Sequence, residues 1–149
     1  MRQITTKPEG PGRPEFILTL PFEVRCKSRF RAPLQDGEEV AVVLPRGGVL
    51  RHGDLLQCDT GGLVEVRAAP QKVSEARTAD PFLLALVCYH LGNRHVPLEI
   101  GPGWLRYEHD HVLDEMVESL GLRVKSAEAP FEPESGAYTA AGGHHHSHD

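Results

Sequence analysis

No long apolar run occurs in this sequence of 149 residues; the longest, from Phe82 to Tyr89, has eight residues. A helix needs about 20 consecutive apolar residues to cross a bilayer, so we expect no membrane-spanning segment and no membrane partner. The first eight residues, Met1 to Pro8, hold neither an apolar core nor a cleavage site, and therefore predict no secretory signal. Both absences favour a cytoplasmic protein.

Cysteine and aromatic residues are also scarce. The three cysteines, Cys26, Cys58 and Cys88, are isolated, and no C-x-x-C pair occurs. The sequence therefore indicates neither a zinc ribbon nor a disulfide framework, and each cysteine is interpreted as a small buried hydrophobe in a reducing compartment. Aromatic residues make up 6% of the chain and the formal net charge is −5, a combination that argues against a nucleic-acid partner.

The acidic charge and the histidines that the chain does contain are unevenly distributed. Residues 1–70 hold ten Lys/Arg against nine Asp/Glu, whereas residues 71–149 hold six against twelve. An acidic second half suits a cation better than a phosphate, although the same charge also serves as a solubilising surface. Four of the nine histidines lie within residues 144–148.

The first half predicts short strands separated by turns, which together indicate a small β-rich domain over residues 1–70. Apolar and polar residues alternate from Phe22 to Arg31, as expected for a half-buried strand, and Asp36-Gly37 is typical of a hairpin turn. The expected strands span 16–20, 22–31, 40–44, 54–57 and 63–67, with a further short apolar pair at Val49-Leu50. Strands at this spacing form a small sandwich or barrel.

The second half, residues 71–133, predicts strands interleaved with two helices. Asp80-Pro81 provides an N-cap followed by proline at the first helical position, and Gly92 is a good terminating residue for a helix over 82–91. A second helix begins near Asp110 and ends at Gly121. The expected strands span 71–77, 96–100, 104–107 and 122–125. The order β-α-β-β-α-β predicts a ferredoxin-like sandwich, so the fold class is α+β.

Residues 134–149 are expected to form a disordered, histidine-rich tail, because they hold too little apolar surface to fold. The tail histidines are His144, His145, His146 and His148. Imidazole is the side chain best suited to nickel, copper and zinc near neutral pH, so this cluster indicates metal binding. A purification tag is the alternative, although Ser147 interrupts the run.

Four further histidines, His90, His95, His109 and His111, lie in the βαββαβ half, and each has a structural alternative to metal binding. His90 falls in the last turn of the first helix, where it complements the helix dipole. His95 belongs to an exposed loop. His109 and His111 flank Asp110 and could form a solvated helix cap. From the residues alone, the sequence does not decide which of them share one surface.

Basic residues recur at every second position of the expected strand 22–31. Arg25, Lys27, Arg29 and Arg31 would share one face of that strand. Such repulsion is tolerable if the side chains are solvated or meet acidic groups. The face is therefore either a solvated edge that resists aggregation or a docking surface for an acidic partner.

Two segments, Tyr89-His-Leu-Gly-Asn-Arg-His-Val-Pro-Leu98 and Tyr107-Glu-His-Asp-His-Val-Leu113, resemble the signature of the UreE family of urease accessory nickel chaperones. The first half, with Leu50-Arg51-His52-Gly53-Asp54, is similar to that family's N-terminal domain, which is regarded as a partner-binding module. The resemblance therefore favours docking for the basic residues.

The resemblance implies a non-enzymatic carrier that forms a homodimer through its metal-binding domain. His95 would be the essential nickel(II) ligand and would face its mate across the dimer, with tail histidines completing the site. His109 and His111 would form a secondary site for copper(II) or zinc(II), and His90 is a weaker candidate. The implied partners are the urease apoprotein complex and the urease accessory GTPase.

Two other functions compete with the carrier. His109-Asp110-His111 is half of a binuclear ligand set and Glu108 could serve as a base, but a metallohydrolase needs a fuller set of ligands than we identify. A metal-independent assembly module would use the basic face and the acidic half to bind partners.

Overall fold

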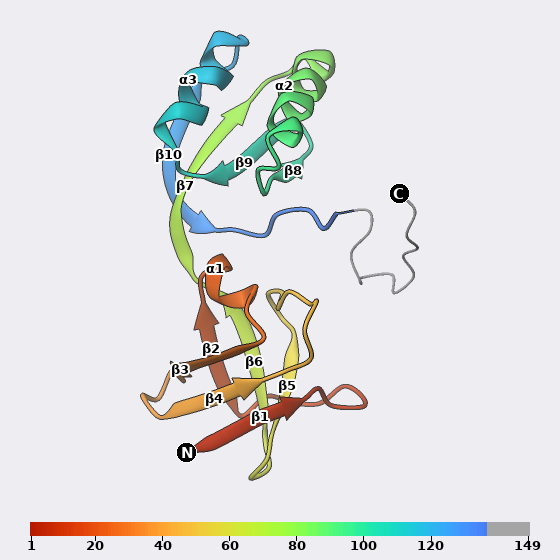
Figure 1. The fold of residues 1–149 in the computed structure, drawn as a ribbon, viewed down its shortest axis with the longest axis vertical. Coiled ribbons are helices and arrows are strands. Elements are labelled where there is room, and N and C mark those ends of the chain that lie inside the picture. Colours follow the sequence, from red (N-terminus) through yellow and green to blue (C-terminus); the bar gives the residue numbers. More distant parts are fainter. Residues whose placement is uncertain (137–149) are drawn as a thin grey trace. The chain divides into compact units, whose positions relative to one another are not determined.

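The chain forms two compact units in the computed structural model, which describes residues 1–136 (Figure 1). One unit is built on Met1–Ala69 and the other on Pro70–Glu134. Strands predominate over three helices within the described residues, so the fold is α+β as expected. None of these three helices is long and apolar enough to cross a membrane.

A six-stranded mixed sheet with the order β2-β6-β5-β1-β4-β3 forms the first unit. Its strands are β1 (Arg2–Thr6), β2 (Phe16–Leu20), β3 (Arg29–Pro33), β4 (Glu39–Val43), β5 (Leu55–Cys58) and β6 (Leu63–Ala68). The pairs β1–β4 and β2–β6 are parallel, and the remaining pairs are antiparallel. Sequence alternation predicted most of these strands, but not β1.

Alternating side chains of these strands form the core of the first unit. Val64 and Val66 on β6 are fully buried, while Glu65 between them is partly exposed. The same period of two buries Val40 and Val42 on β4, because successive strand side chains point to opposite faces. The expected short strand at Val49-Leu50 is not formed, although Leu50 still packs into this core.

The expected strand 22–31 is wrong in its first half. Phe22–Arg25 form one helical turn, α1, and only the residues from Arg29 onward extend as β3. Arg25 is fully buried, and its guanidinium donates hydrogen bonds to the carbonyls of Leu20 (3.1 Å) and Leu50 (3.2 Å). These buried carbonyls need donors, and the arginine fork supplies them. The period-two pattern was therefore misleading, because Arg25 faces inward.

The second unit consists of an antiparallel four-stranded sheet and two helices in the order β-α-β-β-α-β. The elements are β7 (Pro70–Arg77), α2 (Pro81–Asn93), β8 (Glu99–Gly101), β9 (Trp104–Glu108), α3 (His111–Ser119) and β10 (Val124–Pro130). The strand order in the sheet is β10-β7-β9-β8, and all three pairings are antiparallel. The element order agrees with the expectation.

Both helices cover one face of this sheet (Figure 1). Val87 and Leu91 of α2 and Val117 of α3 pack with Leu105 and Tyr107 of β9 in one core. Each helix starts where the sequence predicted. The Asp80 carboxylate accepts hydrogen bonds from the Phe82 and Leu83 amides, and the Asp110 carboxylate accepts them from the Val112 and Leu113 amides.

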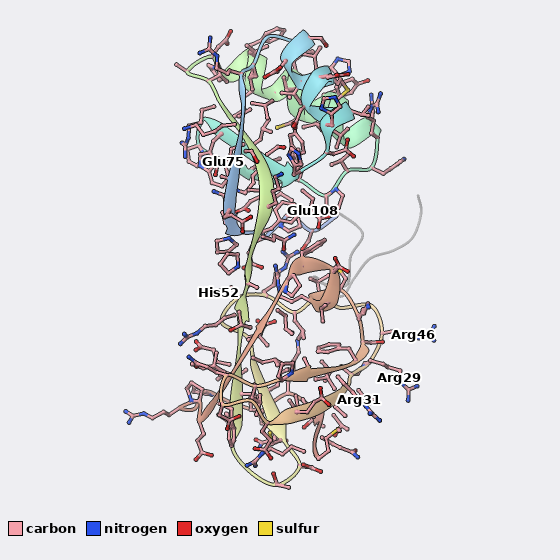
Figure 2. The ribbon with its side chains drawn as sticks, turned by 90° about the vertical axis from the view of Figure 1, so that its left-hand side faces the viewer. Arg29, Arg31, Arg46, His52, Glu75 and Glu108 are labelled. Atoms are coloured by element: carbon pink, nitrogen blue, oxygen red, sulfur yellow. The ribbon has the colours of Figure 1, made fainter. Side chains whose placement is uncertain are left out.

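Charged and aromatic side chains occupy the other face of the sheet. Arg106 on β9 pairs with Glu75 on β7, which Figure 2 labels, and with Glu99 on β8 at 3.4 Å. The Arg106 guanidinium also lies 4.9 Å from the ring centroid of Trp104. An ideal Cβ on Gly101 would lie 2.2 Å from that ring, so the indole rests directly on the glycine backbone.

Candidate functional site

His95 follows the C-terminus of α2 in a Schellman motif. The Val96 amide donates to the Leu91 carbonyl (3.4 Å), and the His95 amide donates to the Gly92 carbonyl (3.0 Å). Leu91 and Val96 also pack into the same core, which is the apolar contact that accompanies this motif. His95 therefore occupies the position at which helices most often carry glycine.

The backbone of His95 adopts a left-handed conformation, with φ of 58°. Within residues 1–136 it is the only residue other than glycine with a positive φ. Gly92, which the sequence suggested as the terminating residue, lies inside the helix instead. The His95 side chain is exposed, so a costly conformation holds an imidazole in solvent beyond the end of α2.

His95 and His109 line the same shallow surface hollow. The hollow is also lined by Glu108, Asp110, Val96, Pro97 and Leu113. The loop after α2 and the junction between β9 and α3 thus meet at one surface, which the sequence could not establish. Imidazole with nearby carboxylate oxygens is a donor set that suits divalent nickel, copper and zinc.

A polar network holds the ring of His109. Its Nδ1 lies 3.2 Å from the Ser74 hydroxyl and 3.6 Å from Asp114 Oδ2. The other oxygen of Asp114 accepts a 2.6 Å hydrogen bond from the Tyr107 hydroxyl. Burial raises the pKa of Tyr107, and the hydrogen bond to Asp114 raises it further, so the phenol remains a donor.

The remaining candidate histidines have different environments. The side chain of His111 is 82% exposed, and its Nε2 lies 3.1 Å from Glu115 one turn along α3. His90 is half-buried in the last turn of α2, with its ring edge-on to that of Tyr89 at 5.3 Å between centroids. Among residues 1–136, no three histidine, cysteine or acidic side chains are grouped closely enough to hold a metal ion. The tail histidines His144, His145, His146 and His148 lie outside the described residues.

Sequence reasoning missed Ser74, Tyr107 and Asp114. Ser74 on β7 and Tyr107 on β9 are directly opposite each other in the sheet and both are fully buried. The available signal was a tyrosine at an inward-facing strand position, because a buried phenol needs a hydrogen-bond partner. No pattern in the sequence indicated that Asp114 would be that partner.

The structure forms only part of the basic face that the sequence predicted on strand 22–31. Arg29 and Arg31 are exposed on β3, an edge strand, and Arg46 in the loop after β4 projects to the same side of the first unit (Figure 2). Within residues 1–136 these three arginines make no ion pair. Arg25 is not part of the face because it is buried, and exposed Lys27 lies in the link before β3.

Comparison with known proteins finds one family for both halves of the chain. Residues 1–69 match the family model for the UreE urease accessory protein, N-terminal domain, and residues 71–149 match the one for its C-terminal domain. The urease accessory protein UreE of Citrobacter koseri is 53% identical over 150 residues, covering 99% of both chains.

Two further relatives carry the same name. The protein of Alkalilimnicola ehrlichii is 62% identical over 124 residues, covering 83% of this chain and 76% of its own. The protein of Escherichia coli O157:H7 is 51% identical over 150 residues, covering 100% of this chain and 97% of its own. On these matches, which span both units, the chain belongs to the UreE family of urease accessory proteins.

Proposed function

We propose that this protein is a nickel(II) metallochaperone that delivers the ion for assembly of the urease active site. Membership of a urease accessory family supports a role in urease maturation. The observation that carries the metal assignment is the exposed imidazole of His95, held at φ of 58° where glycine would be more stable. Histidine is a less stable choice than glycine in this conformation, so a function of the exposed imidazole explains its presence there.

The nickel ion would be held between two copies of the chain. One imidazole on a surface loop cannot hold a metal ion alone, but two related by a twofold axis begin a site. The exposed side of α2 offers the contact, because Phe82 and Tyr89 are 73% and 63% exposed and lie seven residues apart with Ala85 between them. This apolar stripe occupies one side of the helix that leads to His95.

His109 and His111 are proposed to form a secondary site for copper(II) or zinc(II), and His90 is a weaker candidate. The tail histidines 144–146 and 148 would complete the shared nickel site. An all-imidazole site releases its ligands one at a time, which suits a protein that must give up its metal. The cytoplasmic location remains a prediction.

Nickel titration by calorimetry, together with mass measurement in solution, tests the assignment. His95→Gly should abolish the tightest nickel-binding event, because the substitution removes the imidazole and suits the backbone. His52→Asn is the matched control. His52 accepts a hydrogen bond at Nδ1 from the Ala68 amide, and the asparagine oxygen can replace that acceptor. Equal nickel affinity in wild type and His95→Gly would refute the carrier site.

The basic edge of the first unit is proposed as the docking surface for an acidic segment of the urease apoprotein complex or of its accessory GTPase. Arg29 and Arg31 lie opposite Val43 and Ala41 of β4, so two cations flank an exposed valine on one face. Unpaired cations on an edge strand attract an acidic partner and raise its association rate.

Charge reversal tests this surface. The double variant Arg29→Glu/Arg31→Glu should slow association with immobilised urease apoprotein complex and reduce its dependence on salt. The double variant Arg123→Glu/Lys125→Glu is the control, since it changes the charge equally at exposed positions in the second unit. Equal association rates for both variants would show that the basic edge does not dock the partner.

We also infer that residues 71–133 form a ferredoxin-like unit and that residues 134–149 act as its tail. The β-α-β-β-α-β order and the antiparallel strand order β10-β7-β9-β8 support the first inference. The metal-independent module is the alternative function. Nickel bound by untagged protein without hydrolytic activity favours the carrier over both the module and a metallohydrolase.

A further inference from the structure

Three polar side chains behind His109 determine which of its ring nitrogens carries the proton. Tyr107 has a single hydroxyl proton, and the 2.6 Å contact commits it to Asp114. This hydrogen bond fixes one oxygen of the Asp114 carboxylate and leaves the other, Oδ2, 3.6 Å from Nδ1 of His109.

The position of the His109 proton follows from the two oxygens beside its Nδ1. The hydroxyl oxygen of Ser74 lies 3.2 Å from Nδ1 and can accept a hydrogen bond from it. Asp114 Oδ2, 3.6 Å from the same nitrogen, also favours a proton there. A carboxylate can only accept, so this contact places the proton on Nδ1, and Ser74 then accepts from the same N–H.

We propose that Asp114, held in place by Tyr107, is a positioning residue that fixes the proton of His109 on Nδ1 and so presents Nε2 to a metal ion. Nε2 makes no hydrogen bond within residues 1–136, and the side chain is 33% exposed on the hollow that it shares with His95. Metal-binding histidines commonly donate their second ring N–H in this way, which orients the ring and raises its basicity.

This arrangement makes the two histidines of His109-Asp110-His111 unequal. His111 contacts only an exposed carboxylate, Glu115, whose side chain is 69% exposed, so its ring is free to rotate. His109 is held in one orientation by groups that are mostly buried. A metal ion at the secondary site should therefore bind His109 first, with His111 as an adaptable second ligand. The inference rests on the proposed function, in which His109 is a metal ligand.

Nitrogen NMR of the histidine rings in the full-length, metal-free protein tests the proton position directly. Wild type should show the His109 proton on Nδ1. Asp114→Asn should shift it toward Nε2, the nitrogen that imidazole in water prefers to protonate. Glu115→Gln is the matched control, because it removes the same charge from the next residue of α3 and should leave His109 unchanged.

Zinc(II) titration followed at the His109 ring completes the test. Asp114→Asn should weaken zinc binding by about 10- to 100-fold relative to Glu115→Gln. If Asp114→Asn does not fold, Tyr107→Phe should shift the proton in the same direction, since it removes the hydroxyl that holds the Asp114 carboxylate in place. An unchanged proton position in these variants would overturn the positioning role alone. If zinc does not change the NMR signals of the wild-type His109 ring, the role of His109 as a ligand is overturned as well.

Discussion

At the level of single residues, His95 combines a strained backbone with an exposed imidazole. A left-handed conformation costs an L-residue roughly 1–2 kcal/mol, whereas glycine adopts it readily but loses more chain entropy on folding. We therefore expect His95→Gly to leave the free energy of unfolding unchanged or to raise it by up to about 1 kcal/mol. Urea denaturation measures this difference, and His95→Val should be destabilising because branching at Cβ worsens the left-handed strain.

This prediction separates binding from folding in one experiment. A His95→Gly protein that is at least as stable as wild type but no longer binds nickel tightly would tie the imidazole to function alone. A loss of stability above about 1 kcal/mol would mean instead that the ring makes packing contacts that the exposed position does not suggest.

Two glycines of the second unit predict opposite effects of the same substitution. An alanine Cβ at Gly101 would meet the Trp104 ring at 2.2 Å, and that ring is held by the guanidinium of Arg106, so Gly101→Ala should cost about 1–3 kcal/mol. A Cβ at Gly92 meets nothing within 4 Å in the helix, so Gly92→Ala should stabilise by about 0.5–1 kcal/mol. Thermal unfolding of both variants is the measurement, and equal melting temperatures would contradict the packing argument.

At the level of elements, the sequence predicted helices and strands where a local signal determines them. Asp80 with Pro81 and Asp110 mark both helix starts, and apolar alternation marks β4 and β6. The prediction failed at α1, because the buried guanidinium of Arg25 donates to the carbonyls of Leu20 and Leu50, and Leu50 lies far along the chain. The placement of His95 and His109 on the same hollow likewise depends on tertiary packing, so no spacing in the sequence could reveal it.

The two helix caps allow a matched comparison. Asp80→Ala and Asp110→Ala each remove a carboxylate that accepts two backbone hydrogen bonds, and each should cost about 0.5–2 kcal/mol by chemical denaturation. Only Asp110 lies between His109 and His111. Asp110→Ala should therefore also weaken zinc binding at the secondary site, while Asp80→Ala should not. Equal zinc affinity in the two variants would show that the cap does not set the geometry of these histidines.

At the level of the whole molecule, nickel binding and self-association should be linked. An ion that binds only the paired state stabilises that state, by an amount that grows with the logarithm of its concentration divided by its Kd. The apolar stripe on α2 is the contact that we propose, and its side chains are exposed in the single chain. Charge placed there should separate the copies without unfolding either one, because it removes no buried packing.

Tyr89→Glu should therefore give a species near the single-chain mass of 16.4 kDa in light-scattering measurements, where wild type should be a dimer. Ile100→Glu, which changes another exposed apolar residue of the second unit, is the control and should stay dimeric. If two His95 rings share one ion, nickel should bind at one equivalent per two wild-type chains, and that event should weaken sharply in Tyr89→Glu even though His95 is intact. A monomeric Tyr89→Glu protein with undiminished nickel affinity would mean that each chain binds its metal alone.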